Sequence, residues 1–300
     1  MLSAFPPPMQ LRSALRLLAW LALAVAAVAR GDDPAAQMRA RYAALGPRLA
    51  QSPFQRPIVL ESDQGAGILR GEVHAVVGYP YAAVAAALES AAQWCDILIL
   101  HLNVKYCHAL PGRPHSLITL RVGRKSEQAL EQTSQADFDF SVAGAAPDYL
   151  RVQLRAESGP FGTSDYRILL EAVPVDGGRT FIRFAYSYAD SFLASLAMRG
   201  YLATVGSDKV GFTVVGRQPD GQTAYVGDVR GVVERNTMRY FLAIEAYLAA
   251  LALPPERRFE ARIAHWYAAT ERYPRQLHEL ERDEYLEMKR REYRRMQEGR

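Results

Sequence analysis

The sequence predicts an α+β fold in which an antiparallel sheet packs against helices. Three observations predict it. Most segments between residues 98 and 188 alternate apolar and polar side chains, which is the period of a strand with one solvated face. The turn signal Asp176-Gly177-Gly178 joins the last two of these segments as a hairpin. A long helix with an apolar stripe, from about Val232 to Leu251, follows the strands and does not alternate with them.

Residues 1–29 have the pattern of an export signal. Arg12 and Arg16 supply positive charge, an apolar run covers residues 17–25, and Ala27-Val28-Ala29 matches the small-x-small site of signal peptidase. The run is shorter than the roughly 20 apolar residues of a membrane-spanning helix. We therefore expect export, cleavage near Ala29 and no stable membrane span afterwards. An uncleaved anchor or a buried N-terminal helix are the alternatives.

The composition is typical of a folded protein with a substantial core. Hydrophobic residues make up 49% of the chain and aromatic residues 10%, more than disordered chains carry. The net charge is +4, but charges of both signs are mixed, so we expect no nucleic-acid partner. Arg far outnumbers Lys and Ala is abundant, which indicates a GC-rich bacterial genome. We therefore expect a periplasmic or secreted protein, whose true start is either Met1 or Met9.

The segments before the strand-rich region predict a helix, an edge strand, a strand and a second helix. The first helix, residues 34–50, is expected to break near Gly46-Pro47. Residues 58–60 form a short edge strand in this prediction. Residues 71–78 form the next strand, and residues 81–94 form a helix with one apolar stripe.

The strand-rich region begins with the alternating segment 98–106. Further predicted strands cover residues 117–122, 138–142, 150–154, 166–173 and 180–188. A helix is expected over residues 191–204. Segments 209–215 and 223–227 then form a second hairpin around Pro219-Asp220-Gly221.

The C-terminal residues 256–298 are rich in charge and predict two helices. The first has an apolar face of Phe259, Ile263, Trp266 and Tyr267, and we expect it to dock on the domain. The second, residues 275–298, has a thinner stripe of Leu277, Leu280, Tyr285 and Met288. We interpret it as a solvated amphipathic helix, with a partner-binding or dimerising helix as the alternative.

Cys95 and Cys107 are the two cysteines of the chain. In an oxidising compartment an isolated pair usually forms a disulfide. If residues 96–106 were one extended strand, their Cα atoms would lie roughly 40 Å apart, whereas a disulfide needs about 7 Å or less. A bridge therefore requires a bend, for example a helix that continues past Cys95. Two buried thiols are the alternative.

We find no catalytic motif, and we expect no cofactor and no metal. His278-Glu279 begins like a zinc-protease motif, but Arg282 stands where the second histidine is required. His101 and His108 have no Asp or Glu in ligand register, so we interpret them as surface or core histidines. Asp137 and Asp139 share a strand face and could act as paired carboxylates, but a solvent-facing strand explains them more simply.

Two clusters are candidates for a ligand site. The last long strand places Ile182, Phe184, Tyr186 and Tyr188 on one face, and the long helix adds Tyr240 and Ile244. Tyrosine combines apolar area with a hydroxyl group, which suits the wall of a pocket for an amphipathic molecule. Ordinary core packing is the alternative for each of these residues.

Arg235 and Arg239 are like charges one turn apart on the long helix. Such a pair destabilises a helix unless an acid or an anion lies beside it. We therefore consider both arginines candidates for binding an anionic headgroup. The alternative is a salt bridge between elements, to Asp165 or Asp208.

The order of strand, helix, about six antiparallel strands and long C-terminal helix resembles the helix-grip fold of the START and Bet v 1-like superfamily. The features that carry the resemblance are Gly71 to Val77, Tyr79-Pro80-Tyr81, Trp94, the strand 166–173 feeding 180–188, and the helix 232–251. The resemblance implies a curved sheet that grips the helix around an apolar cavity. It transfers no catalytic residue. The region 191–228 and the tail after residue 255 are additions that could fill or cover the cavity.

We divide the chain into a signal peptide (1–29), a helix and linker (30–69), a START-like domain (70–251) and a charged helical extension (252–300). The leading hypothesis is an exported, non-enzymatic binding protein for a lipid or another apolar or amphipathic small molecule. One alternative is an envelope interaction protein with a filled core, whose C-terminal helix binds a protein partner. The other is a cyclase-like or hydrolase-like enzyme.

Overall fold

The computed structural model describes residues 33–65, 67–112, 115–189 and 209–299. The predicted signal peptide, the predicted helix 191–204 and Asp208 lie outside these ranges. Within the described ranges, no helix is both long enough and apolar enough to cross a bilayer.

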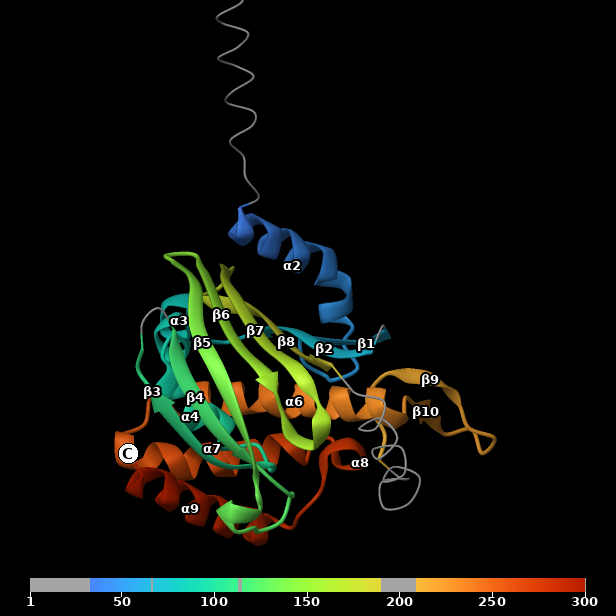
Figure 1. Ribbon diagram of the computed structural model, residues 1–300. Coiled ribbons are helices and arrows are strands. Elements are labelled where there is room, and N and C mark those ends of the chain that lie inside the picture. The colour runs from blue at the N-terminus through green and yellow to red at the C-terminus, as the bar shows by residue number, and fades with distance from the viewer. Residues whose placement is uncertain (1–32, 66, 113–114, 190–208, 300) are drawn as a thin grey trace, which may run out of the picture.

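Eight strands form one open antiparallel sheet in the order β1-β2-β8-β7-β6-β5-β4-β3 (Figure 1). Antiparallel pairing joins every pair of neighbours. The strands are β1 (Ile58–Gly65), β2 (Ile68–Val77), β3 (Val104–Leu110), β4 (Ser116–Val122), β5 (Ser134–Ala146), β6 (Tyr149–Ser158), β7 (Ser164–Val175) and β8 (Arg179–Ala189). Short 3-10 turns, Leu130–Gln132 and Pro160–Gly162, lie beside β5 and between β6 and β7. The predicted α+β class and the predicted edge strand are confirmed.

The long helix α6 (Asp228–Ala249) lies across the inner face of the sheet, which bends around it in Figure 1. Phe241, Ile244 and Leu248 of α6 are buried in the core. The helix also contacts α7 (Pro255–Thr270), and most of its side chains are buried. This is the packing expected of a helix enclosed between two layers.

The predicted strand over residues 98–106 is wrong in its first half. The predicted helix 81–94 is two helices, α3 (Tyr81–Leu88) and α4 (Ala91–Leu98), and α4 continues past Cys95. The chain then turns and enters β3 only at Val104. Because Leu98, Leu100 and Leu102 are all buried in this turn, their spacing imitates the period of a strand.

Helix α2 (Pro34–Ala50) covers part of the outer face of the sheet and runs through Pro47 without a break. The predicted break at Gly46-Pro47 is therefore wrong. Pro47 lies in the last turn, where its missing N–H costs a single hydrogen bond of the helix. Leu45 and Leu49 are buried on either side of it, in a cluster with Phe181 of β8, and this burial keeps the turn helical.

The C-terminal extension ends in α8 (Pro274–Leu277) and α9 (Arg282–Glu298). Helix α9 packs against β3 and α7 and buries Tyr285, Met288 and Met296. The interpretation of this segment as a solvated helix is therefore wrong. A second sheet of two strands, β9 (Val214–Arg217) and β10 (Thr223–Tyr225), forms the predicted hairpin beside the start of α6.

Candidate functional site

Aromatic side chains from β8 and α6 meet on the inner face of the sheet. Tyr240 of α6 lies 5.4 Å from Tyr186 and 6.4 Å from Phe184, measured between ring centroids. Tyr188 lies 5.7 Å from Tyr186. The other two candidates, Ile182 and Ile244, are fully buried in the same core. The structure therefore brings the predicted strand and helix residues together.

Three further rings, which were not predicted as ligand-site residues, join this cluster. Tyr166 of β7 stacks on Tyr188 at 5.2 Å, and Phe138 of β5 meets Tyr166 edge-on at 6.2 Å. His101, in the turn between α4 and β3, stacks on Tyr240 at 4.4 Å. Tyr166 and Phe138 follow the alternation of their strands, which could have identified them. His101 precedes its strand, so no pattern in the sequence points to it.

Tyr240 lies deep in the protein but keeps accessible surface. Desolvation by burial, and secondarily Tyr166, raise the pKa of its hydroxyl. Val232, Asn236 and Tyr240, each one turn apart on α6, are only half-buried, whereas most of their neighbours on the helix are buried. This stripe of α6 therefore borders space that a water-sized molecule can enter.

The predicted headgroup residues lie on α6 near this cluster. Arg239 is 1% exposed and donates to Glu279 at 2.7 Å and to the Leu277 carbonyl at 3.3 Å. Arg235, one turn earlier, is also buried. Arg239 thus forms the expected salt bridge between elements, but its partner is Glu279 of the C-terminal extension. Asp165 pairs with Arg167.

Glu279 binds a group of basic side chains. Lys125 lies 2.5 Å from its carboxylate and Lys209 lies 3.6 Å away, in addition to Arg239. Burial opposes the ionisation of Glu279, but Arg239 and Lys125 outweigh it and lower its pKa. Burial and the neighbouring Arg239 lower the pKa of Lys125 to about 8. Among the described residues, three cations therefore bind this one carboxylate.

His101 is held as a neutral ring. It is 2% exposed, and burial together with the charges of Arg239, Lys289, Lys125 and Lys105 lowers its pKa well below the usual range. Its Nδ1 accepts a hydrogen bond from the backbone N–H of Asn103 at 3.2 Å. A neutral imidazole that accepts at Nδ1 carries its proton on Nε2. Nε2 is buried and has no hydrogen-bond partner among the described residues.

Helix α9 holds the turn that carries His101. Lys289 donates to the carbonyls of His101 and Val104 at 2.7 and 3.0 Å, and Tyr285 donates to the Leu100 carbonyl at 2.9 Å. Lys105 donates to the Leu102 carbonyl at 2.9 Å. These side chains donate to backbone carbonyls of the turn and of the start of β3, and so hold the turn in place. The C-terminal extension is therefore part of the frame of the site.

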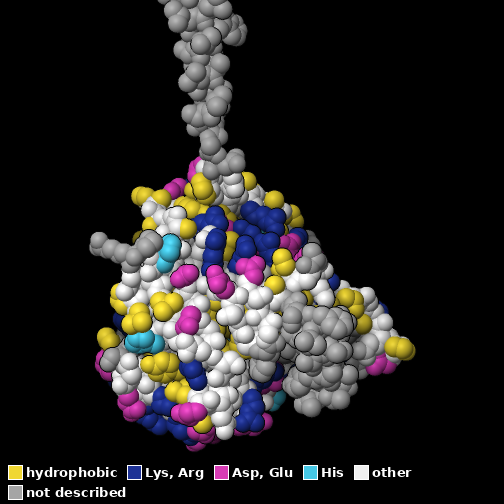
Figure 2. Space-filling model, viewed as in Figure 1, with side chains coloured by type: hydrophobic (Ala, Val, Ile, Leu, Met, Phe, Trp, Pro, Cys, Tyr) yellow, Lys and Arg dark blue, Asp and Glu magenta, His cyan; other side chains and the backbone are white. Residues whose placement is uncertain are grey.

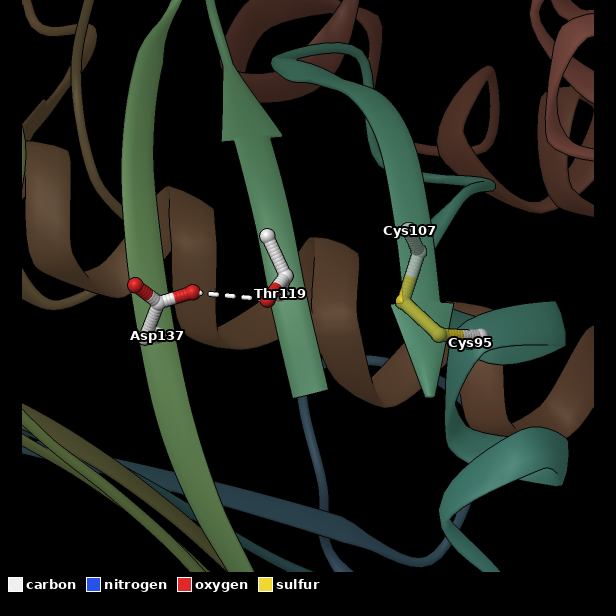
Figure 3. Close-up of a disulfide and its surroundings, with 4 residues drawn as sticks. All are labelled: Cys95, Cys107, Thr119 and Asp137. Carbon is white, nitrogen blue, oxygen red and sulfur yellow. Dashed lines mark hydrogen bonds between the residues drawn. A yellow bond between two sulfur atoms is a disulfide. The ribbon is translucent and has the colours of Figure 1, made fainter. Parts of the chain in front are cut away.

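Cys95 and Cys107 are bonded and join α4 to β3, with their Cα atoms 5.3 Å apart (Figure 3). The continuation of α4 past Cys95 supplies the bend that the sequence argument required. Figure 3 also shows Asp137 turned toward Thr119 on the neighbouring strand, and the Thr119 hydroxyl donates to it at 2.7 Å. Asp137 and Asp139 are exposed, while Phe138 between them is buried. These carboxylates therefore lie on the outer face, away from the aromatic cluster.

The described residues include one group with the geometry of a metal site, formed by Glu61, Glu72 and His74 on the outer face. Two of its members, Glu61 and Glu72, line a polar cleft of about 540 Å³ between α2 and the sheet. Arginines already pair with both carboxylates: Arg41 and Arg48 with Glu61, and Arg70 and Arg183 with Glu72. Figure 2 shows basic side chains gathered on this face below α2. The arginines supply the positive charge that a cation would otherwise bring.

The chain order around the site decides the fold. Strand β2, helices α3 and α4 and six antiparallel strands follow one another. After the β9–β10 hairpin comes the long helix α6, which lies on the inner face of the sheet. The protein has the helix-grip, START and Bet v 1-like fold. Strand β1 precedes β2 and adds a strand to the edge of the helix-grip sheet. Helices α7, α8 and α9 follow α6 and are additions to the fold.

Comparisons with known proteins give structural neighbours only. No protein-family model matches the chain, and no curated protein matches its sequence. A conserved protein from Geobacillus kaustophilus is similar over 60% of this chain and 95% of its own, with 12% identity and a TM-score of 0.35. The Zhui aromatase/cyclase from a Streptomyces species is similar over 69% of this chain and 95% of its own, with 12% identity and a TM-score of 0.32. Human StAR-related lipid transfer protein 5 is similar over 56% of this chain and 90% of its own, with 7% identity and a TM-score of 0.30. The fold assignment rests on the strand order and the helix.

Proposed function

We propose that this protein binds a lipid or another apolar or amphipathic small molecule, as a non-enzymatic carrier or sensor that is exported to the periplasm or beyond. The observation that carries the proposal is Tyr240, which lies deep in the protein, contacts the rings of Phe184 and Tyr186, and still keeps accessible surface. Ligand area buried against such rings contributes about 25 cal/mol per Å². The tyrosine hydroxyls can orient a polar end.

Two observations favour a binding protein over the alternatives. The apolar stripe of α9, including Tyr285 and Met288, is buried against the rest of the chain, so the same stripe does not serve an external partner. The carboxylates considered as an acid and base pair, Asp137 and Asp139, lie on the outer face of the sheet. These two carboxylates therefore cannot act as an acid and base pair on a ligand held in the aromatic cluster.

Native mass spectrometry of protein purified from the periplasm without detergent tests the proposal. We expect a co-purifying small molecule bound to the wild-type chain. Tyr240→Ala removes a central ring of the cluster and should lower the ligand-bound fraction roughly tenfold. Tyr42→Ala is the control, because Tyr42 contacts Phe181 on the outer face. A wild-type chain that shows only its own mass, with and without detergent, would count decisively against a carrier.

A further inference from the structure

His101 marks one end of the aromatic cluster with an unused hydrogen-bond donor. Its ring stacks on Tyr240 at 4.4 Å, and its Nδ1 accepts from Asn103, so the proton of the neutral ring is on Nε2. This N–H is buried and has no partner among the described residues. A buried donor without a partner costs free energy unless a ligand acceptor meets it. A ligand in the cluster therefore gains from presenting an oxygen there.

The charges around His101 favour a negatively charged oxygen as the ligand group that accepts from Nε2. Arg239, Lys289, Lys125 and Lys105 act on the ring. Two carboxylates pair with these four cations: Glu279 with Arg239 and Lys125, and Glu292 with Lys105 and Lys289. Within the described part of the chain, the cations around His101 thus exceed the carboxylates bonded to them.

The excess of positive charge lies in a desolvated setting. Arg239, Lys105 and Lys289 are at most 1% exposed, and Glu292 is fully buried. Coulomb interactions strengthen where water is excluded, and a buried charge without compensation is unfavourable. A negatively charged ligand group beside His101 would accept a hydrogen bond from Nε2 and would also compensate the excess positive charge.

We infer that the ligand is an acidic amphiphile, whose carboxylate or related oxyanion accepts from His101 Nε2 while its apolar part contacts Tyr240, Tyr186 and Phe184. This inference rests on the proposed function and narrows its ligand class. His101 is the specificity-determining residue. A neutral apolar molecule gains from the rings alone, and a cationic amphiphile is repelled.

Two matched fluorescent probes test the ligand class: dansylaminoundecanoic acid and its methyl ester, titrated against the full chain at neutral pH. The two share the apolar chain and differ in the negative charge. We expect the wild-type protein to bind the acid about tenfold more tightly than the ester, because a charge-assisted hydrogen bond is worth roughly that factor. The ratio of the two affinities does not depend on the fraction of protein that is folded.

His101→Phe keeps a ring on Tyr240 and removes the donor. It should bring the two affinities to within roughly threefold, because the acid loses a charge-assisted hydrogen bond whereas the ester loses at most a weaker one to its carbonyl oxygen. His108→Phe is the matched control, because His108 is a half-buried histidine on β3 that pairs with Thr119, whose side chain lies on the outer face of the sheet. Glu279→Gln removes a carboxylate near the cations and should raise the preference for the acid.

The outcomes separate the two proposals. Binding of neither probe by the wild-type chain would overturn the proposed function, and this inference with it. Equal binding of acid and ester by the wild type would overturn the acidic ligand class alone, and an undiminished preference in His101→Phe would overturn the role of His101 in selecting it. A preference that disappears only in His101→Phe, and not in His108→Phe, supports it.

Discussion

At the scale of single residues, Glu234 shows how one buried carboxylate organises the start of α6. It is fully buried and accepts hydrogen bonds from the backbone N–H groups of Phe212 and Thr213, at 2.6 and 2.9 Å. The hydroxyls of Thr213 and Ser62 also donate to it. Gly211 lies so close that an added Cβ would meet the Glu234 carboxylate at 2.5 Å. Glu234 therefore joins α6, β1 and the segment before β9.

Glu234→Gln should lower the free energy of unfolding by about 2–4 kcal/mol. The amide NH₂ group cannot accept the hydrogen bonds that the carboxylate accepts, so buried donors lose their partner. Urea denaturation followed by circular dichroism measures the loss. Glu287→Gln on the exposed side of α9 is the control, expected within about 0.5 kcal/mol of wild type. A Glu234→Gln protein as stable as that control would contradict this role.

Residue-scale reasoning from the sequence identified the residue types of the site but not all of its members. Phe184, Tyr186 and Tyr240 stand out because tyrosine and phenylalanine recur at the period of a strand or helix. His101 could not be found in this way, because its position depends on a turn held by Lys289 of a distant helix. The partner of Arg239, Glu279, is likewise set by how the C-terminal extension docks.

At the scale of elements, α9 is held by an internal ion network. Lys289 and Lys105 are fully buried and both bind Glu292, at 2.7 and 3.0 Å. Burial, only partly offset by Glu292, lowers the pKa of Lys289 from 10.5 to about 8. The folded protein therefore holds this proton less tightly than the unfolded chain.

This difference sets a sign for the pH dependence of stability. Between about pH 8 and pH 10.5 the unfolded chain binds more protons at Lys289 than the folded protein does, so the contribution of Lys289 to stability rises with pH. Below pH 8 both states are protonated and its contribution is constant. Lys289→Met should remove this rise, although the variant is less stable throughout. Thermal unfolding of both proteins across pH 7–10.5 measures the difference; parallel curves would contradict the prediction.

Element boundaries followed the sequence wherever the local period and the burial agreed. The hairpin of β7 and β8 is such a case, because alternation and the Asp176-Gly177-Gly178 turn point the same way. The turn after α4 is the opposite case, since Leu98, Leu100 and Leu102 are buried on a bend and only resemble a strand. Burial from a distant element also overrode the helix-breaking tendency of Pro47.

At the scale of the whole molecule, the disulfide joins the helical layer to an edge strand of the sheet. Cys95 of α4 and Cys107 of β3 are 12 residues apart in sequence. Closing a loop of this size lowers the conformational entropy of the unfolded chain, which raises its free energy by about 3 kcal/mol and stabilises the folded protein. Replacing both cysteines by alanine should therefore lower the unfolding free energy by about 2–4 kcal/mol.

Differential scanning calorimetry of wild type and the double alanine variant measures this loss. Reduction of the wild type with a thiol should lower its melting temperature in the same direction, while the double variant should not respond to the reductant. A wild type whose melting temperature is unchanged by full reduction would show that the bridge adds no stability.

Three features of the protein could be predicted from local patterns in the sequence: the order of most strands and helices, the solvated outer face of the sheet, and the aromatic residues that α6 and β8 share. These are local properties, because side-chain period and turn chemistry depend on neighbouring residues. The burial of α9, the pairing of Glu279 with Arg239 and the contact of His101 with Tyr240 arise from the way the folded chain packs. Those contacts join segments far apart along the chain, and their free energy comes from burial and charge pairing that no local pattern records.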